Sequence, residues 1–182
     1  MQAGSEASSV EAYAASWVFP FLLSKLPEGA TMVPVPNNIG MQHRHADAWV
    51  RTQDGEAFWV ELKSEQKHTG NLFIEQFSNL KTGTVGWLYH YHDDTILAYA
   101  FNDTHTLYTC RFGALRAWAF GESKHPESLS HYRLEDFNSK GQSKYEQNNE
   151  PLGFIVPVDF FLSEVEGAKR FRCNTKKPAE VS

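Results

Sequence analysis

Residues 46–63, ADAWVRTQDGEAFWVELK, limit the fold more than any other segment of the chain, because they predict a β-hairpin. Asp54-Gly55 lies between two runs rich in apolar and aromatic residues, and this dipeptide readily supplies the positive φ angles of a two-residue turn. Alternation along the second run places its aliphatic side chains on one face and Glu61 and Lys63 on the other. We therefore expect two adjacent strands, with Glu61 and Lys63 together on one face of the second strand.

Glu61 and Lys63 require an explanation in so apolar a strand, because charged side chains are rarely buried without a partner. Asp47 lies near the start of the first run, within reach of the same end of the hairpin. An aspartate beside Glu-x-Lys on the adjacent strand is an arrangement that holds a divalent metal ion next to a basic group. These three residues are the primary candidates for a functional site.

The Glu-x-Lys pattern alone is a weak signal, since the chain contains it three times. The other two copies, Glu65/Lys67 and Glu122/Lys124, lie in polar segments without apolar alternation, and we interpret them as solvated charges. Only the copy in the hairpin combines a predicted buried strand with an aspartate one strand away.

Asp47, thirteen intervening residues and then Glu61-Leu62-Lys63 at the end of an apolar strand resemble the motif of the PD-(D/E)xK nuclease superfamily. The segments HTGNLFIE at 68–75 and GWLY at 86–89 are similar to small nuclease-like members, several of them encoded by phages. Ala46 departs from the pattern, because proline often stands at that position. The resemblance implies an α/β (α+β) fold with a restriction-endonuclease-like core, in which helices flank a mixed central β-sheet.

The resemblance also implies a division of roles. Asp47, Glu61 and the backbone carbonyl of Leu62 would bind Mg²⁺ or Mn²⁺, which prefer oxygen ligands and accept few from the protein. Lys63 would orient the attacking water or help to deprotonate it, while the metal lowers the pKa of that water. The implied enzyme is a metal-dependent deoxyribonuclease. Endonuclease action is favoured, and exonuclease action or an RNA substrate stays open.

Two more glutamates are candidates by their place in the resemblance. Glu75 falls on a predicted helix. It either contributes to catalysis, by contacting a metal ligand or by binding a second metal ion, or it faces solvent. Glu11 is either the extra acid that some of these nucleases draw from an N-terminal helix or part of a capping box that begins at Ser8.

The histidines provide a separate set of candidates. His43, Arg44 and His45 precede Asp47, and we expect them at the rim of the cleft, in contact with phosphate or solvent. A His/His/Asp metal site is the alternative. His90 and His92, with Asp93 and Asp94, are the other candidate metal site, and the favoured alternative places them at the exposed tip of a hairpin. A histidine-rich metal-binding protein would require all four histidines to converge.

Local patterns predict the remaining elements of one nuclease-like domain over 1–182, with a catalytic core at about 8–120. Pro20 should kink or end the first helix. The other expected segments are a strand at 31–35, a helix from Asn71, a hairpin of 87–92 and 95–101, a strand at 107–112, a helix at 113–120, a polar loop at about 135–150, a last strand at 153–156, a helix at 158–165 and a frayed tail over 170–182.

Composition limits the class of protein. The 182 residues are 41% hydrophobic and 14% aromatic, which is typical of a globular domain with a real core. No apolar run approaches the roughly 18 residues of a membrane span, so we expect no membrane partner and a cytoplasmic location, in a cell or an infected host. The net charge of −5 does not favour nucleic acid, although acids at a metal site lower this total without repelling a metal-bridged phosphate.

DNA is the expected partner, and two functional interpretations are open. The first is the nuclease described above, with Trp49 or Trp59 available to stack on a base. The second is a nuclease-fold protein that binds nucleic acid or a protein without cleaving anything. The aromatic content leaves room for a homodimer interface, which no segment identifies.

Overall fold

The computed structural model describes residues 3–35, 46–79, 81–120, 131–133 and 151–173, and its class is mixed α/β, as predicted. The elements in chain order are α1 (Ala3–Leu23), β1 (Thr31–Pro34), β2 (Ala48–Arg51), β3 (Ala57–Glu65), β4 (Asn71–Asn79), β5 (Thr84–Val85), the 3₁₀ helix η1 (Trp87–Tyr89), β6 (Ile96–Phe101), β7 (Thr106–Arg111), α3 (Phe112–Phe120), β8 (His131–Arg133), β9 (Leu152–Pro157), α5 (Val158–Glu164) and β10 (Lys169–Arg172).

The predicted hairpin is confirmed as β2 and β3. The two strands pair antiparallel, with Ala48 opposite Val60 and Arg51 opposite Ala57. Gly55 in the connecting turn has a φ of 93°, a conformation that glycine adopts without the steric cost that a Cβ adds. The hairpin therefore forms for the local reason that the sequence indicated.

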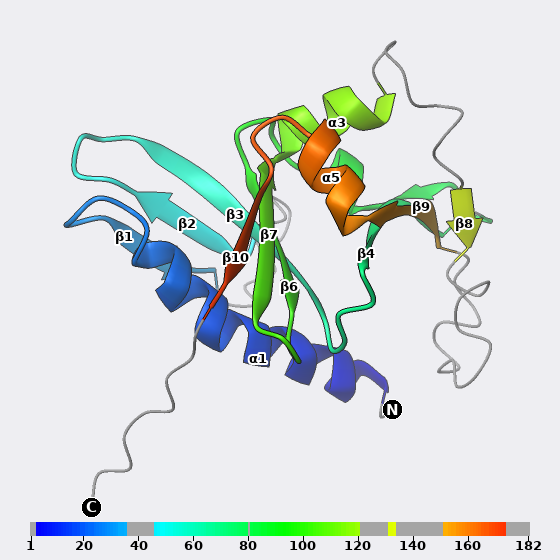
Figure 1. The fold of residues 1–182 in the computed structure, drawn as a ribbon, viewed down its shortest axis with the longest axis horizontal. Helices are drawn as coiled ribbons and strands as arrows, with labels where there is room; N and C mark the ends of the chain where they lie inside the picture. The colour runs from blue at the N-terminus through cyan, green and yellow to red at the C-terminus, as the bar shows by residue number, and fades with distance from the viewer. Residues whose placement is uncertain (1–2, 36–45, 80, 121–130, 134–150, 174–182) are drawn as a thin grey trace, which may run out of the picture.

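The hairpin is part of a six-stranded sheet of order β1-β2-β3-β6-β7-β10. Strands β3 and β6 run parallel, and the other neighbours in this sheet run antiparallel. A second sheet has the order β5-β4-β9-β8 (Figure 1). The parallel β3–β6 pair requires a crossover, and the segment that makes this crossover contains β4, β5 and η1.

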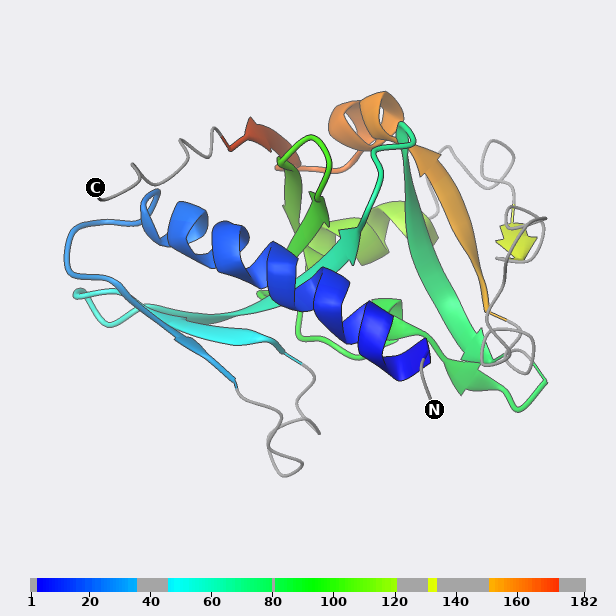
Figure 2. The same cartoon turned by 90° about the horizontal axis from the view of Figure 1, so that it is seen from below.

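The larger sheet lies between two hydrophobic cores. On one face, α1 packs its buried Ala14 and Val18 against strand residues such as Val60 and Leu62. Figure 2 shows α1 crossing the strands of this sheet, with its N-terminal end directed toward the second sheet. The opposite face packs against the second sheet, η1, α3 and α5. Glu61 and Lys63 alternate with Val60 and Leu62 on β3, so they lie on this second face.

Three predicted elements are wrong. The expected helix from Asn71 is strand β4, which pairs with β9 about eighty residues later in the chain. The expected strand 87–92 is the 3₁₀ helix η1 followed by a turn, although the second arm of that hairpin, 95–101, forms β6. The tail does not fray at Arg170, because Lys169–Arg172 forms β10 and pairs with β7. The strand at 153–156 is present as β9, but it is not the last.

The first helix also differs from the prediction. It begins at Ala3, so Ser8 lies inside α1 and is not its N-cap, and the predicted capping box is wrong. Pro20 is inside the helix, which continues to Leu23. The expected loop at 135–150 lies outside the described residues. Over the described part of the chain, no helix has the length and apolar character needed to cross a membrane.

Candidate active site

Asp47 and Glu61 meet at the open end of the β2–β3 hairpin. The Asp47 N–H donates to the carbonyl of Val60 at 2.9 Å, which continues the strand pairing one residue beyond Ala48. The Asp47 Oδ2 accepts the N–H of Leu62 at 2.7 Å. The backbone of β3 therefore fixes the Asp47 carboxylate beside the Glu-x-Lys segment, as the spacing predicted.

Lys63 and Glu61 form a direct ion pair. The Lys63 Nζ lies 2.5 Å from Glu61 Oε1, and Glu61 as a whole is only 3% exposed. Burial raises the pKa of the Glu61 carboxyl to about 8, with Lys63 opposing that rise and Asp47 adding to it. Burial alone would lower the pKa of Lys63, but the carboxylates around it outweigh burial and raise it. Lys63 is therefore an ammonium at neutral pH.

Tyr91 is a member of the site that the sequence did not identify. Its side chain is buried and forms a hydrogen bond with Glu61, and burial together with the negative charge of Glu61 raises the pKa of the phenol. Tyr91 follows η1 and precedes β6, so only the fold brings it to Glu61. No local pattern in the sequence indicates this contact.

Glu75 lies in the same region, but on strand β4 and not on a helix. Its Oε1 accepts the N–H of Trp87 at 3.4 Å, and its side chain is half-buried, so the solvent-facing alternative is not what the structure shows. Burial raises the pKa of Glu75, whereas Lys63 lowers it. Glu75 thus belongs to the second sheet and interacts electrostatically with Lys63 of the first sheet.

Glu11 reaches the site from α1. It lines the same cavity as Lys63. The loss of water around its carboxyl raises its pKa, Lys63 lowers that pKa, and Asp47 raises it. With the capping box excluded, the extra-acid alternative is the one that agrees with this position.

A cavity of about 810 Å³ adjoins the ion pair and extends between β3 and β4. Glu65 lines it two residues beyond Lys63, and the Tyr99 hydroxyl donates a hydrogen bond to the Glu65 carboxylate. Glu65 is half-buried, so our interpretation of it as a solvated charge was wrong. The alternation of Glu61, Lys63 and Glu65 was the signal that places all three on one face.

Four carboxyl groups interact electrostatically with the single ammonium of Lys63, namely those of Glu11, Asp47, Glu61 and Glu75. Within the described ranges, no three His, Cys, Asp or Glu side chains are grouped closely enough to hold a metal ion by themselves. Two carboxylates and a backbone carbonyl are nevertheless a donor set that suits Mg²⁺, because this ion keeps several waters and takes few protein ligands. The excess of carboxyl groups also fits a divalent cation, whose charge would favour their ionised forms.

The histidine candidates fall into two groups, one outside the described residues and one at the surface. His43, Arg44 and His45 lie outside the described residues. His90 and His92 are both exposed, as expected, and His90 Nε2 lies 3.1 Å from the carbonyl of Val85.

Two tryptophans extend the polar face of the hairpin. Trp49 and Trp59 lie directly opposite each other on β2 and β3, and each is half-buried. Alternation puts Trp59 on the same face of β3 as Glu61. Stacking of either tryptophan on a base stays a prediction.

Comparisons of the chain with protein-family models, with curated proteins and with solved structures found no match. The chemistry assigned to the site therefore depends on the geometry of its own residues.

Proposed function

We propose that this chain is a metal-dependent nuclease that hydrolyses phosphodiester bonds in DNA. The observation that carries the proposal is the convergence of Asp47, buried Glu61 and Lys63 beside a cavity, with a 2.5 Å ion pair between Glu61 and Lys63. The same three residues carry the resemblance to the PD-(D/E)xK superfamily, which supports the proposal independently of the geometry.

Asp47, Glu61 and the carbonyl of Leu62 would hold Mg²⁺ or Mn²⁺. The ion would supply a water of lowered pKa and positive charge next to the scissile phosphate. Asp47 is held for this role by the Leu62 N–H, and the buried side chain of Glu61 is held by its contacts with Lys63 and Tyr91. The protein thus fixes the orientation of both carboxylates before any ligand binds.

Lys63 acts as a hydrogen-bond donor in this proposal. In the metal-free protein the surrounding carboxylates raise the pKa of Lys63, and the resulting ammonium can orient the attacking water or a phosphate oxygen. The side chain is 26% exposed, so the ammonium is partly accessible from the cavity while Glu61 holds it in place. We propose the orienting role for Lys63, and help in deprotonating the water is the other role that the resemblance implies.

DNA is the substrate class that we propose, with endonuclease action and a cytoplasmic location. Trp49 and Trp59 provide aromatic surface for bases next to the carboxylates.

The test is cleavage of plasmid, linear duplex, single-stranded and branched DNA with Mg²⁺, Mn²⁺ or a chelator. We expect metal-dependent cutting by the wild type and a loss of at least about 100-fold in Glu61→Ala and Lys63→Ala. Glu56→Ala and Lys169→Ala are matched controls, because each removes one exposed charge of the same sign away from the site. Circular dichroism should show that all variants remain folded.

Absence of cleavage by the wild type on every substrate would contradict the proposal, as would variants that cut as fast as the wild type. Binding of the same DNA without cleavage would then favour the alternative of a nuclease-fold binding protein.

A further inference from the structure

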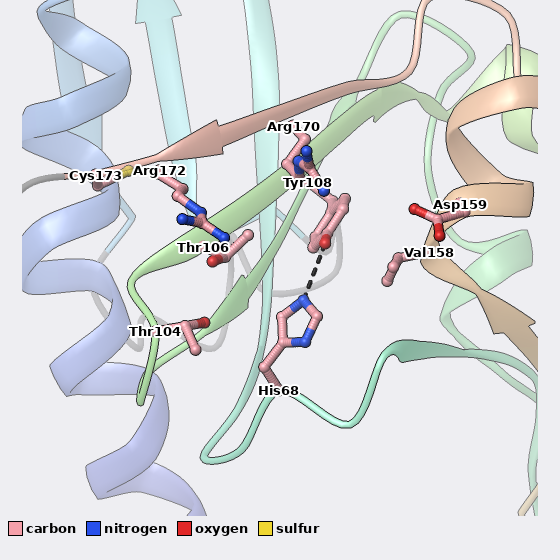
Figure 3. A pocket seen from close by; sticks show the side chains of 9 residues that line it. All are labelled: His68, Thr104, Thr106, Tyr108, Val158, Asp159, Arg170, Arg172 and Cys173. Carbon is pink, nitrogen blue, oxygen red and sulfur yellow. Dashed lines mark hydrogen bonds between the residues drawn. The ribbon is translucent and has the colours of Figure 1, made fainter.

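A second cavity, of about 600 Å³, lies on the edge of the large sheet between β7, β10 and the segment that connects β3 to β4. Arg170 and Arg172 on β10 lie directly opposite Tyr108 and Thr106 on β7. Since alternate residues share one face of a strand, both arginines are on the same face as Tyr108. Figure 3 shows these side chains around the cavity, with His68 on its opposite side.

The cavity carries an excess of positive charge. Both arginines are exposed, and among the described residues neither has a carboxylate within ion-pair distance. Arg170 lies close enough to the Tyr108 hydroxyl to interact with it electrostatically. Among the lining residues that the structure describes, Asp159 at the start of α5 supplies the one carboxylate, across the cavity from Thr106 (Figure 3). Two guanidinium groups thus outnumber one carboxylate.

The polar groups below the arginines are held in place. Tyr108 is 1% exposed, and its hydroxyl lies 2.9 Å from His68 Nε2. The backbone N–H of His68 donates to both carboxylate oxygens of Asp103, at 3.0 and 3.1 Å. Thr106 is also buried. These groups form an ordered floor beneath the two exposed arginines, so binding of a ligand by the arginines would not carry the entropic cost of ordering it.

We propose that this cavity binds the phosphate group of a nucleotide, either free or within a strand. Two guanidinium groups with neighbouring hydroxyl and imidazole groups offer more donors than the two oxygens of a carboxylate accept, and they suit the oxygens of a phosphate. The volume exceeds that of a phosphate alone and leaves room for an attached sugar. Asp159 is then an acceptor for a sugar hydroxyl.

The cavity is separate from the candidate active site. None of its lining residues lines the cavity next to Lys63, and the two cavities lie on either side of one short segment. Lys67 and Thr69 in that segment line the active-site cavity, whereas His68 lines this one. The inference therefore does not depend on catalysis by Asp47 and Glu61.

The experiment measures binding in chelator, so that cleavage does not interfere. The probes are inorganic phosphate, adenosine 5′-monophosphate and a short fluorescent single-stranded oligodeoxynucleotide. NMR of the arginine Nε–H groups follows the two small probes, and anisotropy follows the oligonucleotide. We expect phosphate to shift the signals of Arg170 and Arg172. The double substitution Arg170→Gln and Arg172→Gln should weaken binding of the responding probe by about tenfold or more.

Lys169→Gln is the matched control, because it removes one positive charge from β10 on the opposite face of the strand. It should change each dissociation constant by less than about twofold. Arg172→Gln alone serves as a second variant that leaves Arg170 next to Tyr108 unchanged. Thermal melts should show that every variant is folded.

The probes distinguish the source of the phosphate. Arginine-dependent binding of the mononucleotide supports a free nucleotide, and arginine-dependent binding of the oligonucleotide alone supports a strand. The proposal is overturned if no probe binds, if the arginine variants bind as the wild type does, or if Lys169→Gln weakens binding equally. Glu61→Ala should retain binding here, which separates this inference from the proposed catalysis.

Discussion

Glu61 is the residue of the candidate site whose charge is most affected by its surroundings. Its side chain is buried next to a second carboxylate, and one ammonium only partly compensates the charge. A folded protein that keeps such a group without a cation binds a proton there more tightly than the unfolded chain does. The stability of the metal-free protein should therefore depend on pH through this position.

The first prediction is that Glu61→Gln makes stability less sensitive to alkaline pH in chelator. The pKa of Glu61 rises from 4.5 to about 8 on folding. The stability linked to its proton is therefore fully present below about pH 4.5 and is lost as pH rises through about 8. Melting temperatures of wild type measured from pH 5 to pH 9 should fall, and those of the variant should fall less. Parallel curves for the two proteins would contradict this expectation.

The second prediction concerns the metal. Mg²⁺ should raise the melting temperature of the wild type, because an ion that binds only the folded state stabilises it by about 2.7 kcal/mol at a hundredfold excess over Kd. Asp47→Asn removes one of the two proposed carboxylate ligands and should abolish most of this rise, and chelator should reverse it. An equal rise in both proteins would place the ion elsewhere.

At the scale of residues, the sequence predicted Asp47, Glu61 and Lys63 because local alternation and a tight turn put them together. Tyr91 was missed because its contact with Glu61 depends on how η1 and the following turn pack, which no periodicity records. For Glu11, the capping box at Ser8 was the favoured interpretation, ahead of a role in the site. The earlier start of α1 removed that explanation.

At the scale of elements, the β2–β3 hairpin was predicted from local sequence, whereas β4 depends on a distant partner. The hairpin depends on a local turn, so its sequence specifies it. In β4, Phe73 and Phe77 have the spacing of a helix face, but Leu72 and Ile74 are the fully buried residues. The strand forms because β9 pairs with it, and this partner is too distant in the sequence to leave a local pattern.

The third prediction tests the local origin of the hairpin. Gly55 has a φ of 93°, and no atom lies within 4 Å of a Cβ built at this position. Gly55→Ala should therefore lower the free energy of unfolding through backbone conformation alone, by about 1–2 kcal/mol. Gly55→Asn should cost less, because asparagine tolerates positive φ better. Denaturant titration measures both values. Equal, negligible costs would show that the turn adapts to any residue.

At the scale of the whole molecule, the six-stranded sheet connects the two cores. Neighbouring residues on one strand belong to different cores, since Leu107 packs with α1 and Tyr108 packs with the second sheet and α5. Glu61 and Lys63 are on the face toward the second sheet, where Glu75 approaches from β4. The candidate site therefore requires both sheets to be folded.

The fourth prediction is that the two cores unfold together. Leu72→Ala in the second sheet and Leu107→Ala in the core beneath α1 each truncate a fully buried side chain, so each should cost about 2–5 kcal/mol. Because β7 contributes to both cores, both variants should keep one transition, with tryptophan fluorescence and far-ultraviolet circular dichroism changing at the same denaturant concentration. If Leu72→Ala produced an earlier, separate transition, the second sheet would be an independent unit. The candidate site would then lose Glu75 before it loses Asp47 and Glu61.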